Sequence, residues 1–145
     1  MDSPAGNYVP LRVHSHHSLL RGTATVADLC RAAASRGCEA LALTDTNSVG
    51  GAVSFWEEAQ AAGLRPILGA EICPANEPPA TLLVRNPDGW RRLNHILTDR
   101  LGNPSFSLAM ALREDRAGLV VLASDPGLLA HLARASGCQS LYVAL

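Results

Sequence analysis

Short apolar runs alternate with segments of helical periodicity along most of the chain. Runs of about four to eight mostly apolar residues favour strands, and apolar residues recurring every three or four positions favour helices. The expected strands cover 9–14, 40–44, 65–72, 80–84, 119–123 and 140–145, and the expected helices cover 26–36, 52–62, 87–97, 108–113 and 127–135. This alternation is typical of parallel βαβ units with right-handed crossovers. The pattern therefore predicts an α/β fold with parallel strands and with helices outside.

Local signals mark where several of these helices begin and end. Thr25, with Asp28 three residues later, resembles a capping box. Gly37 fits the residue that follows a helix C-terminus. The tripeptide Asn-Pro-Asp at 86–88 supplies a cap, a proline for the first helical position and an acidic residue in the first turn. These signals support the helical half of the pattern.

The length of the chain limits the architecture. It has 145 residues, of which 48% are hydrophobic and 17% charged, a composition typical of a soluble globular protein with one domain. A closed (β/α) barrel needs roughly 200 residues or more, so we expect an incomplete barrel. Residues 1–8 are expected to form a flexible leader and 9–145 the domain. The apolar ending at 140–145 predicts a last strand without a covering neighbour, as in a truncated domain.

Charge and hydropathy exclude several classes of protein. The formal net charge of −1 argues against binding nucleic acid through bulk positive charge, although a local patch remains open. No apolar run reaches the roughly 18 residues of a membrane span, and residues 1–9 lack a signal-peptide core. The four cysteines form no Cys-x-x-Cys pair, which favours free thiols. We therefore expect a cytoplasmic chain that does not associate with membranes.

Polar residues follow three of the expected strands at the points where these strands end. The endings are 11–18, 42–47 and 66–72. Because the carboxyl ends of parallel strands meet at one edge of a sheet or barrel, residues far apart in sequence come to line one site there. The sequence therefore predicts a single functional site at this edge.

The first strand ending contributes three histidines, His14, His16 and His17, with Arg12 just before them. Imidazoles two residues apart on a strand point to the same side, so His14 and His16 could share a metal ion. The alternative is a polar loop whose histidines face solvent. Both interpretations stay open at this point.

Three carboxylates stand at the other strand endings. Asp45 and Asp125 could bind metal, but an Asp just before a helix is more often a helix cap, which is the favoured interpretation for both. Glu71 closes an apolar strand, where a carboxylate is costly unless it meets a cation or several donors. Glu71 could bind metal, pair with Arg12 or emerge at the surface.

Together these residues resemble the PHP (polymerase and histidinol phosphatase) domain at the start of bacterial C-family DNA polymerases, the polymerase III alpha subunit and its error-prone relative. Where this family reads close to LHVHSxxSLLDG and ALAxTDHxxxxG, the chain has LRVHSHHSLLRG at 11–22 and ALALTDTNSVGG at 40–51. Further matches are GLRPILGAEI at 63–72, LLVRNPDGWRRL at 82–93 and GLVVLA at 118–123. The resemblance covers nearly the whole chain and implies an incomplete PHP-type barrel.

The resemblance also implies a site in which histidines and carboxylates hold up to three zinc or manganese ions, which activate water to attack a phosphoester. His14 and Glu71 are the retained ligands, with His16, His17, Asp45 and Asp125 as weaker metal candidates. The family's other ligands are replaced by Arg12 (for a histidine), Arg21 (for a carboxylate) and Thr46 (for a histidine).

An arginine repels a divalent ion, so these replacements favour a metal-free relic site in which Arg12 pairs with Glu71. We therefore expect no cofactor, and zinc or manganese only if the site is functional. The resemblance places the chain in a family of DNA-directed DNA polymerases, but we expect this segment alone to lack catalytic activity.

The expected function is that of a non-catalytic module of a polymerase III alpha-type subunit, with a structural or interaction role in DNA replication or translesion synthesis. Its expected partners are the remainder of such a chain or replication proteins such as a proofreading exonuclease, with DNA contacted only indirectly. The alternatives are a metal-dependent phosphoesterase, acting as a 3′–5′ exonuclease or on small phosphate esters, and a free-standing ligand-binding domain.

Overall fold

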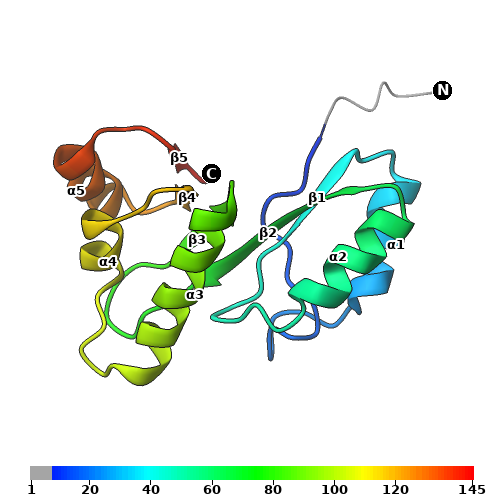
Figure 1. Ribbon diagram of the computed structural model, residues 1–145, viewed down its shortest axis with the longest axis horizontal. Coiled ribbons are helices and arrows are strands. Elements are labelled where there is room, and N and C mark those ends of the chain that lie inside the picture. Colours follow the sequence, from blue (N-terminus) through cyan, green and yellow to red (C-terminus); the bar gives the residue numbers. More distant parts are fainter. Residues whose placement is uncertain (1–7) are drawn as a thin grey trace.

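The computed structural model describes residues 8–145, so nearly all of the leader predicted for 1–8 lies outside the described residues. Five strands and five helices follow one another through this part of the chain (Figure 1). The strands are β1 (Ala40–Leu43), β2 (Arg65–Ile72), β3 (Ala80–Val84), β4 (Leu119–Ala123) and β5 (Leu141–Val143). The helices are α1 (Val26–Ser35), α2 (Ala52–Ala61), α3 (Pro87–Gly102), α4 (Leu108–Glu114) and α5 (Pro126–Ser136).

The strands form one sheet in the order β1-β2-β3-β4-β5. β1 pairs with β2 and β4 with β5 in parallel, whereas β3 runs antiparallel to both of its neighbours. The predicted α/β class is thus confirmed, and the expectation of parallel strands holds for all but β3. The reversal follows from the link between β2 and β3, which is residues 73–79 with three prolines and no helix. A parallel neighbour needs a longer crossover connection.

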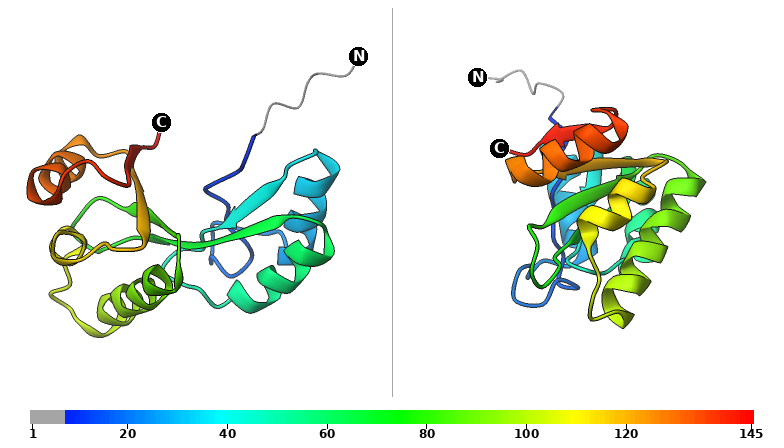
Figure 2. Two further views of the ribbon diagram at one scale, coloured as in Figure 1. Left: turned by 45° about the horizontal axis from the view of Figure 1, so that its top comes forward. Right: turned by 90° about the vertical axis from the view of Figure 1, so that its left-hand side faces the viewer.

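β2 joins the two halves of the molecule. Its first half, Arg65 to Leu68, pairs with β1, and its second half, Gly69 to Ile72, pairs with β3. Figure 2 shows α1 and α2 beside β1 at one end, and α3, α4 and α5 gathered at the other. The two halves therefore meet at the middle of β2, between Leu68 and Gly69.

The first strand predicted from the sequence, 9–14, is not a strand in the structure. This segment does lie beside β1, because the carbonyl oxygens of Pro10 and Val13 accept hydrogen bonds from the amides of Ala42 (2.9 Å) and Thr44 (2.8 Å). Pro10 has no N–H to return, and the Val13 amide donates to the Thr44 hydroxyl at 2.9 Å instead of to a backbone oxygen. The segment is therefore tied to β1 without completing a ladder.

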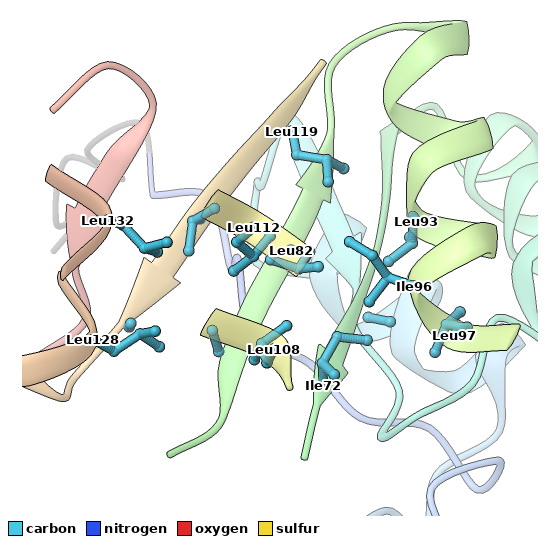
Figure 3. Close-up of a cluster of buried hydrophobic side chains, with 14 residues drawn as sticks. Ile72, Leu82, Leu93, Ile96, Leu97, Leu108, Leu112, Leu119, Leu128 and Leu132 are labelled. Atoms are coloured by element: carbon cyan, nitrogen blue, oxygen red, sulfur yellow. The ribbon is translucent and has the colours of Figure 1, made fainter. Parts of the chain in front are cut away.

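Each half of the molecule has its own apolar core. The smaller core lies between α1, α2 and β1, where Cys30, Phe55 and Ala59 are almost fully buried. The larger core lies between the sheet and α3, α4 and α5, and Figure 3 shows its leucine and isoleucine side chains converging on this interface. It contains Ile72, Leu82, Leu93, Ile96, Leu97, Leu108, Leu112, Leu119, Leu128 and Leu132.

The predicted helix starts are present. The side chain of Thr25 accepts a hydrogen bond from the Asp28 amide at 3.1 Å, and that of Asn86 accepts one from Gly89 at 2.9 Å. These contacts satisfy amides that have no partner within the helix. Within residues 8–145, the helices are too short or too polar to serve as membrane spans.

We predict that Ile96→Ala lowers the free energy of unfolding by about 2–5 kcal/mol, because it leaves a cavity in the larger core. Urea denaturation followed by circular dichroism measures this loss. Leu101→Ala, on the exposed side of α3, is the matched control and should change stability by less than about 0.5 kcal/mol. Equal losses in the two variants would contradict the assignment of this core.

Candidate functional site

The carboxylate of Glu71 is the centre of the predicted site. Its side chain is only 6% exposed, at the end of β2. Arg12 Nη2 lies 3.5 Å from Glu71 Oε1, and His14 Nε2 lies 3.1 Å from Oε2. Arg21 Nη1 also donates to Oε2, and the Thr46 hydroxyl donates to the same oxygen at 3.4 Å. The structure thus brings five of the predicted site residues together around one buried charge.

The backbone around Glu71 holds this carboxylate in place. The Glu71 amide donates to the carbonyl oxygen of Asp45 at 3.1 Å, and the Asn47 amide donates to the carbonyl oxygen of Glu71 at 2.8 Å. These two bonds align the end of β2 with the segment after β1. As predicted, consecutive strand endings meet at one edge of the sheet.

Asp45 has a different role from the one favoured by the sequence. Its buried carboxylate accepts hydrogen bonds from the Ser15 amide at 2.7 Å, the Ser15 hydroxyl at 2.8 Å and the Ser18 hydroxyl at 2.6 Å. It does not cap α2, which begins several residues later with Gly51 at its N-cap. The capping prediction is therefore wrong, because α2 begins only at Ala52 and the Asp45 carboxylate is bonded by donors from the loop at 15–22. Asp45 positions the loop that carries Arg21.

Burial and charge act in opposite directions on Glu71. Burial raises the pKa of its carboxyl group, but the charges of Arg21, His14 and Arg12 and the hydrogen bond from His14 outweigh it. The pKa of Glu71 is therefore lower than its ordinary value of 4.5. The carboxylate stays ionised at neutral pH and attracts the two guanidinium groups.

The remaining candidates lie outside this cluster. His16 and His17 are exposed, and their rings contact each other with centroids 4.3 Å apart. Asp125 accepts a hydrogen bond from the Leu128 amide at 2.7 Å and so caps α5, as the sequence favoured. Asp125 also lines a cavity of about 310 Å³ together with Arg12 and Glu71.

The side chains in this cluster do not fit a divalent metal ion. The described residues 8–145 contain no group of three or more His, Cys, Asp or Glu side chains arranged to hold one. The two retained donors, His14 and Glu71, are directed at each other, and the carboxylate already carries two guanidinium groups. A metal at this place would have to displace these cations from Glu71.

Two features of the site were missed from the sequence. The Arg12–Glu71 pair was predicted, but Arg21 is an additional partner, and the serines that hold its loop were not identified as site residues. The sequence did identify Arg21 as a site residue, because it stands where the resembling family has a carboxylate, but it did not predict that Arg21 pairs with Glu71. The positive charge of Arg21 needs a nearby negative charge, and the buried carboxylate of Glu71 provides it.

Comparison with known proteins identifies the family. The model of the family described as "PHP domain" matches residues 10–141, which is most of the chain. This chain belongs to the PHP domain family. The resemblance to the PHP domain that the sequence predicted is thus confirmed.

The curated relatives of this PHP domain are bacterial DNA polymerases. An error-prone DNA polymerase of Symbiobacterium thermophilum is 40% identical over 116 residues, which cover 76% of this chain and 11% of that protein. A DNA polymerase III subunit alpha of Pseudomonas fluorescens is 28% identical over 152 residues, covering 88% of this chain and 13% of that protein. The chain thus spans about a tenth of the length of these relatives.

Solved structures share the fold at low sequence identity. An amidohydrolase from Chromobacterium violaceum, with bound sulfate and no metal, has a TM-score of 0.60 at 18% identity, covering 91% of this chain and 75% of that one. A proposed metal-dependent phosphoesterase from Bifidobacterium adolescentis has a TM-score of 0.53 at 21% identity, covering 63% of this chain and 32% of that one. These likenesses support the fold, in which this PHP domain corresponds to part of a barrel.

We predict that Glu71→Gln lowers the free energy of unfolding at neutral pH by roughly 1.5–3 kcal/mol, the range for hydrogen bonds to charged groups. Because the pKa of Glu71 is lowered on folding, the wild-type advantage is present above about pH 4.5 and is lost as the pH falls through the folded-state pKa. Urea denaturation at a series of pH values measures the difference between the two proteins.

Glu57→Gln, on the exposed surface of α2, is the control for removing one negative charge. Its effect should be within about 0.5 kcal/mol of zero. A difference between Glu71→Gln and wild type that is the same at neutral and acid pH would contradict the ion-pair cluster.

Proposed function

We propose that this chain is a non-catalytic PHP module of a bacterial DNA polymerase III alpha-type protein, with a structural or interaction role in DNA replication or translesion synthesis. The observation that carries the proposal is the cluster around Glu71, where Arg12, His14 and Arg21 occupy the carboxylate. These ion pairs stand at the place that the family resemblance assigns to metal ligands.

Charge supports this proposal over a metal-dependent phosphoesterase. At about 4 Å and an effective dielectric constant near 20, two unit charges interact by about 4 kcal/mol. A divalent ion beside Glu71 would meet repulsion from Arg12 and Arg21, and it would gain only one carboxylate and one imidazole as ligands. Without a bound metal, the site loses the metal-activated water that the family resemblance implies for attack on a phosphoester.

The proposed partners follow from the relatives. Because the matched relatives are polymerases of much greater length, we propose that the module packs against the remainder of a polymerase alpha-type chain or against replication proteins such as a proofreading exonuclease. In this proposal DNA is contacted only indirectly, and the module works in the cytoplasm. The ion pairs around Glu71 then replace a metal as the stabilising centre of the strand ends.

We predict that the chain purified without chelator contains little zinc or manganese and shows no saturable zinc binding at micromolar concentrations. Elemental analysis and titration calorimetry measure the two quantities. His14→Ala and Glu71→Ala are the controls, because both remove a retained ligand. Binding close to one ion per chain that is lost in both variants would overturn the proposal and favour the phosphoesterase.

A second prediction concerns the replaced ligands themselves. The variant Arg12→His/Arg21→Asp/Thr46→His restores the ligand types that the family resemblance assigns to these positions. We expect it to bind zinc in the calorimeter, because two cations are removed and three ligands are added around His14 and Glu71.

The matched control is Arg12→Gln/Arg21→Gln/Thr46→Ser, which removes the same charges without adding strong metal ligands. It should not bind zinc. If the ligand-restored variant folds, as judged by circular dichroism, and still binds no zinc, the replacements are not what keeps metal out.

A further inference from the structure

A loop at the strand ends presents two leucines to solvent. Leu19 is 86% exposed and Leu20 is 99% exposed, although both are large apolar side chains. They lie next to Arg21, which reaches back to Glu71 from the same loop. In the right-hand view of Figure 2 this loop, drawn in blue between the first described residues and α1, projects at the edge of the molecule.

The loop is held in a defined shape. The amides of Arg21 and Gly22 both donate to the carbonyl oxygen of Ser18 at 3.0 Å, and the Ser18 hydroxyl donates to the buried carboxylate of Asp45. At Gly22 a Cβ atom would lie only 2.1 Å from the carbonyl oxygen of Ser15, so the loop folds back closely on itself.

The backbone at the tip of the loop is also unusual. Leu20 has a φ angle of 64°, in the left-handed region that non-glycine residues seldom adopt. Such a conformation persists where the surrounding contacts enforce it, and it is a feature of functional sites. Here it turns the Leu20 side chain outwards instead of towards the protein.

The charged residues next to Leu19 and Leu20 in the sequence are all basic. Residues 11–23 contain Arg12, Arg21 and three histidines but no aspartate or glutamate. The side chains of Arg12 and Arg21 are 44% and 48% exposed, whereas the Glu71 carboxylate that they share is 6% exposed. The surface beside the leucines therefore presents positive charge while its counter-charge is buried.

We propose that Leu19 and Leu20, with the exposed parts of Arg12 and Arg21, form a docking surface for an acidic, apolar segment of a partner protein. Such a segment places apolar side chains against the two leucines and carboxylates against the guanidinium groups. The tied loop lowers the ordering cost of binding, and the arginines give charge complementarity. This inference rests on the proposed function, since it names the surface through which the module would interact.

Charge favours this partner over two others. Two copies of this chain meeting through the same loop would bring their arginines together. Nucleic acid binding draws on many basic contacts, whereas this loop offers two arginines and the chain carries a net charge of −1. An acidic, apolar protein segment meets both the leucines and the positive charge.

The test uses the full chain as bait for a display library of random short peptides. The baits are wild type, Leu19→Ser/Leu20→Ser and the control Leu101→Ser, which removes a leucine that is 74% exposed on α3. Circular dichroism checks that all three fold. Synthetic copies of the peptides enriched on wild type are then measured by fluorescence anisotropy.

We expect the enriched peptides to combine apolar residues with aspartate or glutamate and to bind more weakly at high salt. We also expect their affinity to fall about tenfold or more with Leu19→Ser/Leu20→Ser and to stay unchanged with Leu101→Ser. The proposal is overturned if no peptide is enriched, if the enriched peptides are basic, or if the serine variant binds them as well as wild type does.

Two further measurements separate the other partners. Loop-dependent dimerisation in sedimentation velocity would show a second copy as the occupant, and loop-dependent binding of a DNA oligonucleotide would show a nucleic acid. Either result overturns the docking of an acidic segment. Zinc binding by wild type would instead overturn the proposed function while leaving the peptide result unchanged, so the two failures can be told apart.

Discussion

The neutralisation of one buried carboxylate determines how the strand ends of this protein are arranged. Glu71 is almost fully buried, and an unpaired charge in that position would carry a large desolvation penalty. Three side chains contact this carboxylate: Arg12 and His14 from the segment at 9–14, and Arg21 from the loop at 15–22. The penalty for leaving Glu71 unpaired therefore ties together parts of the chain that are distant in sequence.

A second buried carboxylate supports the first. Asp45 takes three hydrogen bonds from Ser15 and Ser18, and these bonds fix the loop from which Arg21 reaches Glu71. The same loop presents Leu19 and Leu20 to solvent. One contiguous set of polar contacts thus links the interior of the sheet edge to the surface that we propose for docking.

The family resemblance implies metal ligands at the positions where this chain has an ion-pair network. A metal centre and an ion-pair network solve the same physical problem, because each compensates a charge buried at the ends of strands. In this chain Arg12 and Arg21 supply the positive charge, and Glu71 lies between them. In our proposal the scaffold keeps its shape without a metal and serves for contacts with other proteins.

The sequence by itself determined the α/β class, four of the five observed strands closely, the helix caps at Thr25, Asn86 and Asp125, and the edge where the site lies. These depend on local periodicity and on capping residues, which are legible in short windows. Only the tertiary structure decided that β3 is reversed, that residues 9–14 form no strand, that Asp45 binds two serines and that Arg21 joins Arg12 on Glu71. The reversal of β3 follows from the short link at 73–79, whereas the other outcomes depend on which donors meet which acceptors across long stretches of chain. No local pattern encodes that competition.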